Sequence, residues 1–210
     1  MKLAFTTTAM NRPSVVAATY GSFTKYLTGV DFKNSTLYIN IDPLPSGRGR
    51  KAVVKIARTF FGNVIPRYPK KANFAAAVNW LWSQPDDDYI FHLEDDWAML
   101  ESVDINTLLA IFDKRPAMLQ VVLRAYWYKY AKFCLSPSII KRELYKHVGG
   151  SLDESINPEV QLRGQIVNMH KKVAAYPHRV IIKDIGRKWL RTLAYRKPRR
   201  KSEFTSWVKI

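Results

Sequence analysis

The chain has 210 residues, of which 47% are apolar, and it carries 34 Lys and Arg against 17 Asp and Glu. Its length fits one domain with a sizeable core, and the net charge of +17 predicts a partner that is itself an anion. No stretch approaches the ~18 uninterrupted apolar residues of a membrane span, and the first residues lack the apolar segment of a secretory signal. The single cysteine, Cys134, excludes an internal disulfide and makes a structural zinc site improbable, so we expect a cytoplasmic protein.

The first half of the chain alternates between strand and helix patterns. We predict strands over Lys2–Thr7, Thr36–Ile41, Gly62–Ile65 and Tyr89–Leu93, and helices over Val15–Leu27, Lys51–Phe61 and Asn73–Ser83. This alternation indicates an α/β fold with a mostly parallel sheet covered by helices on both faces.

The second half is less regular. We predict helices over Ile105–Asp113, Ser138–His147 and Pro158–Val167, and strands over Ala117–Tyr128, Lys132–Ser136 and Arg179–Asp184. This part of the sheet should be antiparallel or mixed, and the basic, aromatic segment 188–210 should be a C-terminal extension of the domain.

Charge is distributed unevenly along the sequence. Eight of the 17 acidic residues fall within Asp86–Asp104. Gly47–Ala72 holds eight Lys or Arg residues and no acid, and Lys183–Lys201 holds nine against the one acid Asp184. An acidic spot inside a basic protein suits a metal ion that bridges to a polyanionic ligand, although a basic run can also be a solvated surface.

The acidic spot contains Glu94-Asp95-Asp96, directly after the apolar strand Tyr89–Leu93. Adjacent carboxylates repel one another unless a cation neutralises them. In open α/β sheets, ligands bind at the carboxyl ends of the strands. We therefore predict a divalent ion here, bound to the phosphates of a substrate, with a solvated acidic turn as the alternative.

Three further segments accompany this motif in chain order. They are Thr6-Thr7-Thr8-Ala9-Met10-Asn11-Arg12-Pro13 after the first strand, Asp42 after the second, and Asn157-Pro158-Glu159 before a helix. From about Lys2 to Arg187 the chain resembles GT-A glycosyltransferases of the family 2 type, with Glu94-Asp95-Asp96 as a variant of their D-x-D motif. No Q-x-x-R-W motif is present, which disfavours a processive polysaccharide synthase. The small size resembles viral enzymes of this kind, which would act in the host cytoplasm.

The resemblance implies a transfer from a nucleotide-sugar donor that depends on Mn²⁺ or Mg²⁺. Residues 1–97 would form the donor-binding half and residues 98–187 the acceptor-side half. Asp96 is the expected metal ligand, and Asp184 would replace the late histidine ligand of some relatives. The expected donor-binding residues are Thr6, Thr8, Asn11, Arg12, Asp42, Glu94, Asp95, Lys183, Arg187 and Lys188.

An inverting transfer also needs a general base that accepts the proton of the acceptor hydroxyl. Glu159 is the first candidate, with Asp153 and Glu154 in reserve. Glu159 could equally be an acid that stabilises the first turn of a helix. A retaining mechanism would not need this base.

The net charge is the one indication of the acceptor. Lys and Arg contacts to phosphates dominate nucleic-acid affinity, so we favour DNA with a hydroxymethylated base as acceptor, flipped out of the stack. The alternative is a protein or glycan acceptor, with the basic tail on an anionic membrane surface. A non-catalytic nucleic-acid-binding protein is a third possibility, which the carboxylate cluster disfavours.

Overall fold

The computed structural model describes residues 2–43, 49–123, 132–177 and 179–186, together with the backbone of two short paired strands, β12 (Tyr195–Arg196) and β13 (Val208–Lys209). Most of the predicted extension 188–210 and the end of the predicted strand Ala117–Tyr128 lie outside the described residues.

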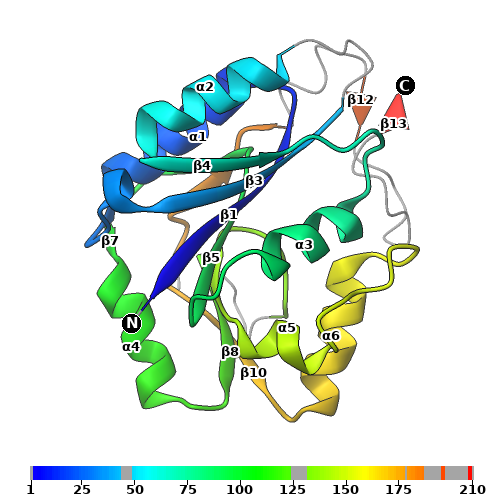
Figure 1. Cartoon of the computed structure of the whole chain (residues 1–210). Coiled ribbons are helices and arrows are strands. Elements are labelled where there is room, and N and C mark those ends of the chain that lie inside the picture. The colour runs from blue at the N-terminus through cyan, green and yellow to red at the C-terminus, as the bar shows by residue number, and fades with distance from the viewer. Residues whose placement is uncertain are drawn as a thin grey trace.

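A seven-stranded sheet, in the order β10-β8-β9-β5-β1-β3-β4, forms the centre of the molecule (Figure 1). Its strands are β1 (Leu3–Met10), β3 (Thr36–Asp42), β4 (Asn63–Arg67), β5 (Tyr89–Glu94), β8 (Met118–Val122), β9 (Ser138–Lys141) and β10 (Lys172–Ala175). Only β9 runs antiparallel to its two neighbours, β5 and β8, and the other pairs in this sheet are parallel. The prediction of a mostly parallel sheet with a mixed second half is confirmed.

Helices cover both faces of this sheet. They are α1 (Pro13–Tyr26), α2 (Arg50–Phe60), α3 (Phe74–Ser83), α4 (Ile105–Lys114), α5 (Glu143–His147) and α6 (Pro158–Asn168). Buried side chains of α1, α2 and α4 belong to one apolar cluster, and those of α3, α5 and α6 belong to a second. Strands β5 and β8 contribute side chains to both clusters, and β1 is buried along most of its length. Strands that are covered on both faces need apolar residues on both, and these three are accordingly apolar along most of their length.

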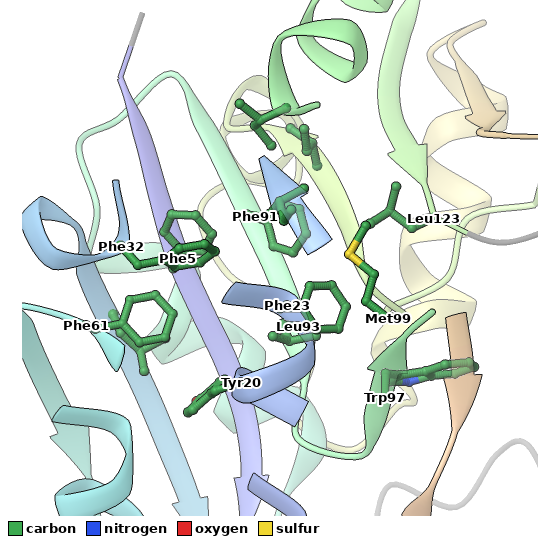
Figure 2. Close-up of a cluster of buried hydrophobic side chains, with 14 of the residues drawn as sticks. Phe5, Tyr20, Phe23, Phe32, Phe61, Phe91, Leu93, Trp97, Met99 and Leu123 are labelled. Carbon is green, nitrogen blue, oxygen red and sulfur yellow. The ribbon is translucent and has the colours of Figure 1, made fainter. Parts of the chain in front are cut away.

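Aromatic rings fill the first cluster (Figure 2). The Phe5 ring lies 5.3 to 5.5 Å, centroid to centroid, from the rings of Phe32, Phe61 and Phe91. Phe91 projects from β5, next to β1 in the sheet, so this packing joins the two central strands. Tilted aromatic contacts of this kind hold the neighbouring strands in a fixed position relative to each other.

Two predictions in the second half were wrong. The segment predicted as a helix over Ser138–His147 begins as strand β9 and becomes helical only at α5. Ile139 and Ile140 are fully buried because β9 pairs on both sides, and a short apolar run of this kind cannot be told from a buried helix by periodicity. The segment Lys132–Ser136 is a loop that is buried from Phe133 onward, and Gln120 Nε2 donates to its Cys134 carbonyl oxygen at 2.6 Å.

The last predicted strand is shorter than expected, and it lies outside the seven-stranded sheet. Of Arg179–Asp184, only β11 (Ile182–Asp184) is extended, and it pairs with β6 (Trp97–Met99) outside the main sheet. A further short pair joins β2 (Leu27–Thr28) and β7 (Val103–Asp104). The β6–β11 pair brings the C-terminal part of the domain against the residues that follow β5.

Candidate functional site

The acidic motif lies at the point where the order of the strands in the sheet reverses. From β1 the chain proceeds outward through β3 to β4, and then returns to β5 on the other side of β1. Asp42 ends β3, and Glu94 ends β5 opposite Thr8 of β1. Ligands of open α/β sheets bind at such a switch point, at the carboxyl ends of the strands.

A buried ion-pair cluster joins the ends of β1 and β5. The Arg12 guanidinium donates through Nε to Asp95 Oδ2 at 2.9 Å and through Nη2 to Asp95 Oδ1 at 2.5 Å. The same Nη2 lies 3.0 Å from Asp96 Oδ2, and all three side chains are at most 3% exposed. Burial alone would lower the pKa of Arg12, but the carboxylates of Asp95 and Asp96 outweigh it and raise that pKa above its usual value.

Asp95 is held at its backbone as well as at its side chain. Its N–H donates to the Thr8 carbonyl oxygen at 3.2 Å, and its own carbonyl oxygen accepts from Thr19 Oγ1 at 2.7 Å. The Met10 N–H donates to Asp95 Oδ2 at 2.9 Å. Nothing in the sequence indicates that Thr19, on α1, holds Asp95, because the two residues are more than seventy positions apart in the chain. These bonds fix the position from which Asp96 projects.

The segment after β11 covers Asp96. The Ile185 N–H donates to the Asp96 carbonyl oxygen at 2.8 Å, and the Gly186 N–H donates to Asp184 Oδ1 at 3.0 Å. A Cβ at Gly186 would overlap the Asp96 carboxylate, so only glycine allows this approach. Asp184 pairs with Trp97 in the register of β11 and β6, which places it beside the residue that follows Asp96.

These carboxylates fit an ion that arrives with its ligand. No group of three or more His, Cys, Asp or Glu side chains poised for a metal occurs among the described residues. A Mg²⁺ or Mn²⁺ ion bound to a diphosphate needs only one or two protein carboxylates, since phosphate and water supply the other ligands. Asp96 and Asp184, which the pairing of β6 with β11 brings to neighbouring positions in the backbone, are the residues that could hold such an ion. Glu94, also predicted here, accepts from Trp97 Nε1 at 2.8 Å.

Asp42 is a second buried acid at the same edge of the sheet. It is 6% exposed and accepts from Asn40 Nδ2 at 2.9 Å. Burial is the main cause that raises the pKa of Asp42 to about 7, and the charge of Asp95 adds to it. The Asn40 bond, Arg50 and Arg67 act in the opposite direction. The predicted nucleoside contact is therefore a carboxyl group that titrates near neutral pH.

The residues predicted in the first loop take different positions. Thr6 is buried inside the sheet, and its Oγ1 lies 3.0 Å from His92 Nδ1. Thr8 contributes the carbonyl oxygen that holds Asp95. Asn11 is 5% exposed and lies against Gly49, directly before α2. Donor contacts by these residues, and by Arg12, stay predictions.

The basic residues predicted to hold the diphosphate lie at the C-terminal end of the described domain. Lys183 is exposed on β11, two residues from Ile185. Arg187 and Lys188 lie outside the described residues.

The first candidate base, Glu159, supports the loop beside it. Glu159 Oε1 accepts from the Leu135 N–H at 2.9 Å, and Oε2 lies 3.4 Å from Arg163 Nη2. Its side chain is 30% exposed, so one side faces solvent. The reserve candidate Asp153 is exposed, and its hydrogen bonds from Ser155 lower the pKa of its carboxyl group.

The loop with the reserve candidates is anchored to α3. Asn73 Nδ2 donates to the Glu154 carbonyl oxygen at 3.0 Å, and Asn79 exchanges two hydrogen bonds with the backbone of Leu152. Since α3 begins shortly after the carboxyl end of β4, this loop is held near the carboxyl ends of the strands, where Asp42 and Asp96 lie.

No helix in the described ranges is long and apolar enough to cross a bilayer.

Sequence comparison gives no relative: no known family profile and no curated protein matches the chain. Structural comparison finds proteins with a similar fold. Residues 1–349 of S. aureus TarS in complex with UDP superpose with a TM-score of 0.64 at 10% identity, covering 87% of this chain and 60% of that one. The mannosyltransferase PcManGT from Pyrobaculum calidifontis, in complex with GDP-Man and Mn²⁺, gives 0.64 at 12% identity, covering 85% and 55%.

A third solved structure is similar in size to this chain. It is CMP:2-keto-3-deoxy-manno-octonic acid synthetase complexed with CTP, with a TM-score of 0.53 at 14% identity, covering 84% of this chain and 89% of that one. The chain spans only about 60% and 55% of the TarS fragment and of PcManGT. At these identities the likeness establishes the fold, and the predicted GT-A-like architecture is confirmed.

The Arg12 cluster generates a prediction about stability. Asp95→Asn leaves the guanidinium buried with a weakened partner, so the free energy of unfolding should fall by about 3–5 kcal/mol. The matched control is Asp86→Asn, which breaks the 2.8 Å pair with Arg142 in which Asp86 is 97% exposed. That change should cost less than about 1 kcal/mol. Urea unfolding measures both, and equal effects would contradict the assigned importance of the cluster.

Asp42 generates a prediction about pH. An acid whose pKa is higher in the folded than in the unfolded chain stabilises the fold below the unfolded pKa, and this contribution is lost as the pH rises through about 7. Asp42→Asn cannot ionise. Between about pH 5 and about pH 8, wild type should therefore lose on the order of 2–3 kcal/mol relative to the variant. Parallel pH profiles of unfolding for the two proteins would exclude a raised pKa.

Proposed function

We propose that the chain is a metal-dependent glycosyltransferase that moves a sugar from a nucleotide-sugar donor to an acceptor hydroxyl. The observation that carries the proposal is the Asp96 carboxylate, fixed by Arg12 at the switch point of a GT-A-like sheet. The complexes of TarS with UDP-GlcNAc and of PcManGT with GDP-Man and Mn²⁺ support a nucleotide-sugar ligand for this fold.

The proposed roles follow from the positions of the side chains. Asp96 and Asp184 would hold Mn²⁺ or Mg²⁺, which neutralises charge on the departing diphosphate when bound. Asp42 and Glu94, at the ends of β3 and β5, would contact the nucleoside. Lys183, exposed beside the segment that covers Asp96, would meet the diphosphate.

The acceptor side requires a proton acceptor if the transfer inverts the anomeric carbon. The acceptor oxygen then bonds to that carbon as the bond to the diphosphate oxygen breaks, and a carboxylate accepts the hydroxyl proton. We assign this role to Glu159, with Asp153 and Glu154 as alternatives at the same edge of the sheet. The anomeric configuration of the product distinguishes inversion from retention.

We propose DNA with a hydroxymethylated base as the acceptor. The net charge of +17 supports it, as does the solvent-facing side of α2, where Lys51, Lys55 and Arg58 are exposed at helical spacing. A protein or glycan acceptor is the alternative, with the basic tail on an anionic membrane. The size match with the CTP-bound synthetase raises one further candidate, a nucleotidyltransferase that releases pyrophosphate from a nucleoside triphosphate.

The donor site is tested with Asp96→Asn. Binding of UDP-GlcNAc or GDP-mannose in Mn²⁺, measured by calorimetry, should be strongly weakened, and donor turnover should fall by at least about 10²-fold because the Lewis acid loses its ligand. Asp86→Asn, at the opposite end of β5, is the control and should match wild type. If Asp96→Asn binds and turns over the donor normally, the metal assignment is wrong. Pyrophosphate release with CTP but no reaction with a nucleotide sugar would favour the nucleotidyltransferase.

The acceptor is tested by the salt dependence of DNA binding. Affinity for hydroxymethylated duplex DNA should fall steeply with salt, in proportion to the phosphates that are neutralised. Ending the chain after Tyr195 removes the five basic residues 196, 197, 199, 200 and 201 together with Lys209, and it should flatten that slope. Donor binding in Mn²⁺ should change little in this variant. Absence of DNA binding by the full chain even at low salt would leave the protein or glycan acceptor.

A further inference from the structure

The loop between β4 and α3 presents one aromatic ring and two cations to solvent. Tyr68 is 44% exposed, and Lys70 and Lys71 are exposed beside it. β4 is the outermost strand on this side of the sheet, and the loop leads from its carboxyl end to α3 (Figure 1). We call the side chains of Tyr68, Lys70 and Lys71 the platform.

Two partly buried arginines hold the backbone of this loop in place. Arg50, at the start of α2, donates through Nη2 to the Pro69 carbonyl oxygen at 2.8 Å. Arg67 donates through Nη1 to the Ala76 carbonyl oxygen of α3 at 2.7 Å, and its guanidinium lies 5.9 Å from the centroid of the Trp80 ring. A loop that is held in this way loses little conformational freedom when a partner binds its exposed side chains.

The positive charge of the platform has no acidic counterpart nearby in the chain. The ion pairs among the described residues all involve other basic side chains than Lys70 and Lys71. The segment Gly47–Ala72 contains no acid, and Lys51, exposed next to Arg50 in the first turn of α2, adds a further positive charge. Lys and Arg side chains gathered in this way indicate a polyanionic partner.

The platform lies beside both parts of the candidate site. β4 pairs with β3, whose last residue is Asp42. In the other direction along the chain, Asn73 follows the platform and donates to the Glu154 carbonyl oxygen of the acceptor-side loop at 3.0 Å. A polymer bound on the platform would therefore lie close to the donor-binding edge and to the loop that carries the candidate bases.

The combination of an aromatic ring with cations favours a nucleic acid over a membrane. Proteins that bind nucleic-acid strands use cations for the phosphates and aromatic rings on which bases stack. A segment that lies in a membrane interface needs a broad apolar face. Tyr68 is the one large apolar side chain exposed at the platform, and the others that are exposed among the described residues lie beyond Met99 in the chain.

We propose that the platform binds the acceptor strand of DNA next to the target base. Lys70 and Lys71 contact phosphates that flank the target, and the Tyr68 ring stacks on a neighbouring base. Extrusion of the target base unstacks its neighbours, which makes a base face accessible to the ring. This inference rests on the proposed DNA acceptor and gives that acceptor a place on the surface of the chain.

The lysines are tested by the salt dependence of binding to a hydroxymethylated DNA duplex, measured by fluorescence anisotropy. K70Q/K71Q should reduce the slope of log Kd against log salt concentration by about 2, because each lysine that neutralises a phosphate contributes about 0.9. K70R/K71R keeps both charges and should keep the slope. The matched control K114Q/R115Q removes two adjacent exposed cations near the amino end of β8, at the opposite edge of the sheet, and should also keep the slope.

The stacking role of Tyr68 is tested on the same duplex. Y68L should weaken binding by about 5- to 100-fold at each salt concentration, and the slope should stay unchanged because stacking releases no counterion. Y68F keeps the ring and should bind as wild type does. Circular dichroism spectra and melting temperatures that match wild type would show that each variant is folded.

The possible results separate this inference from the proposed function. If K70Q/K71Q lowers the slope no more than K114Q/R115Q does, or if Y68L binds as wild type does, the platform assignment is wrong while DNA remains the proposed acceptor. Absence of DNA binding by wild type at low salt would overturn both. Binding to phosphatidylserine vesicles that K70Q/K71Q and Y68L weaken, with no effect on DNA, would make the platform a membrane contact and overturn the inference.

Discussion

The structure depends on one buried cation. Arg12, 1% exposed, bonds to carboxylates that lie more than eighty residues away in the sequence. Removing three charges from water is costly, and the bidentate geometry with Asp95 together with the second contact to Asp96 offsets that cost. The consequence is specific: the end of β1 and the end of β5 are fixed at a common point, and Asp96 projects from that point with a defined orientation.

The other parts of the site are arranged around this point. The segment after β11 crosses Asp96 and needs Gly186 to do so, while Asp184 on the same strand comes beside the motif. Asp42 is close enough to Asp95 for the charge of Asp95 to raise its pKa. A diphosphate with its bound metal ion would bring both negative and positive charge to this site. The ligand itself would then balance the charges of the side chains at the carboxyl ends of the strands.

The sequence predicted the first half of the fold to within a few residues at most boundaries, since β1, β3 and β5 combine apolar runs with clear breaks. It failed where identity depends on distant partners. Ile139 and Ile140 form a strand only because β5 and β8 lie on either side, and Ile182 pairs with β6, a segment without a strand signal. Tertiary pairing decides such short apolar runs.

The site shows the same division. The carboxylates of Asp95 and Asp96 were found from their place after an apolar strand, which is local information. The pairing of Asp95 with Arg12 could not be predicted, because only the folded chain shows that Arg12 engages Asp95 at both oxygens. Likewise, nothing near Thr19 in the sequence indicates its bond to the Asp95 carbonyl oxygen.

The central claim is that Asp96 receives a divalent ion together with a nucleoside diphosphate. A crystal structure of the chain with Mn²⁺ and UDP or GDP, with anomalous data collected at the manganese edge, measures this directly. The account predicts one anomalous peak in contact with the Asp96 carboxylate and with diphosphate oxygens. Nucleotide bound at the ends of β1 and β5 with no manganese at Asp96, or manganese at a different edge of the sheet, would contradict it.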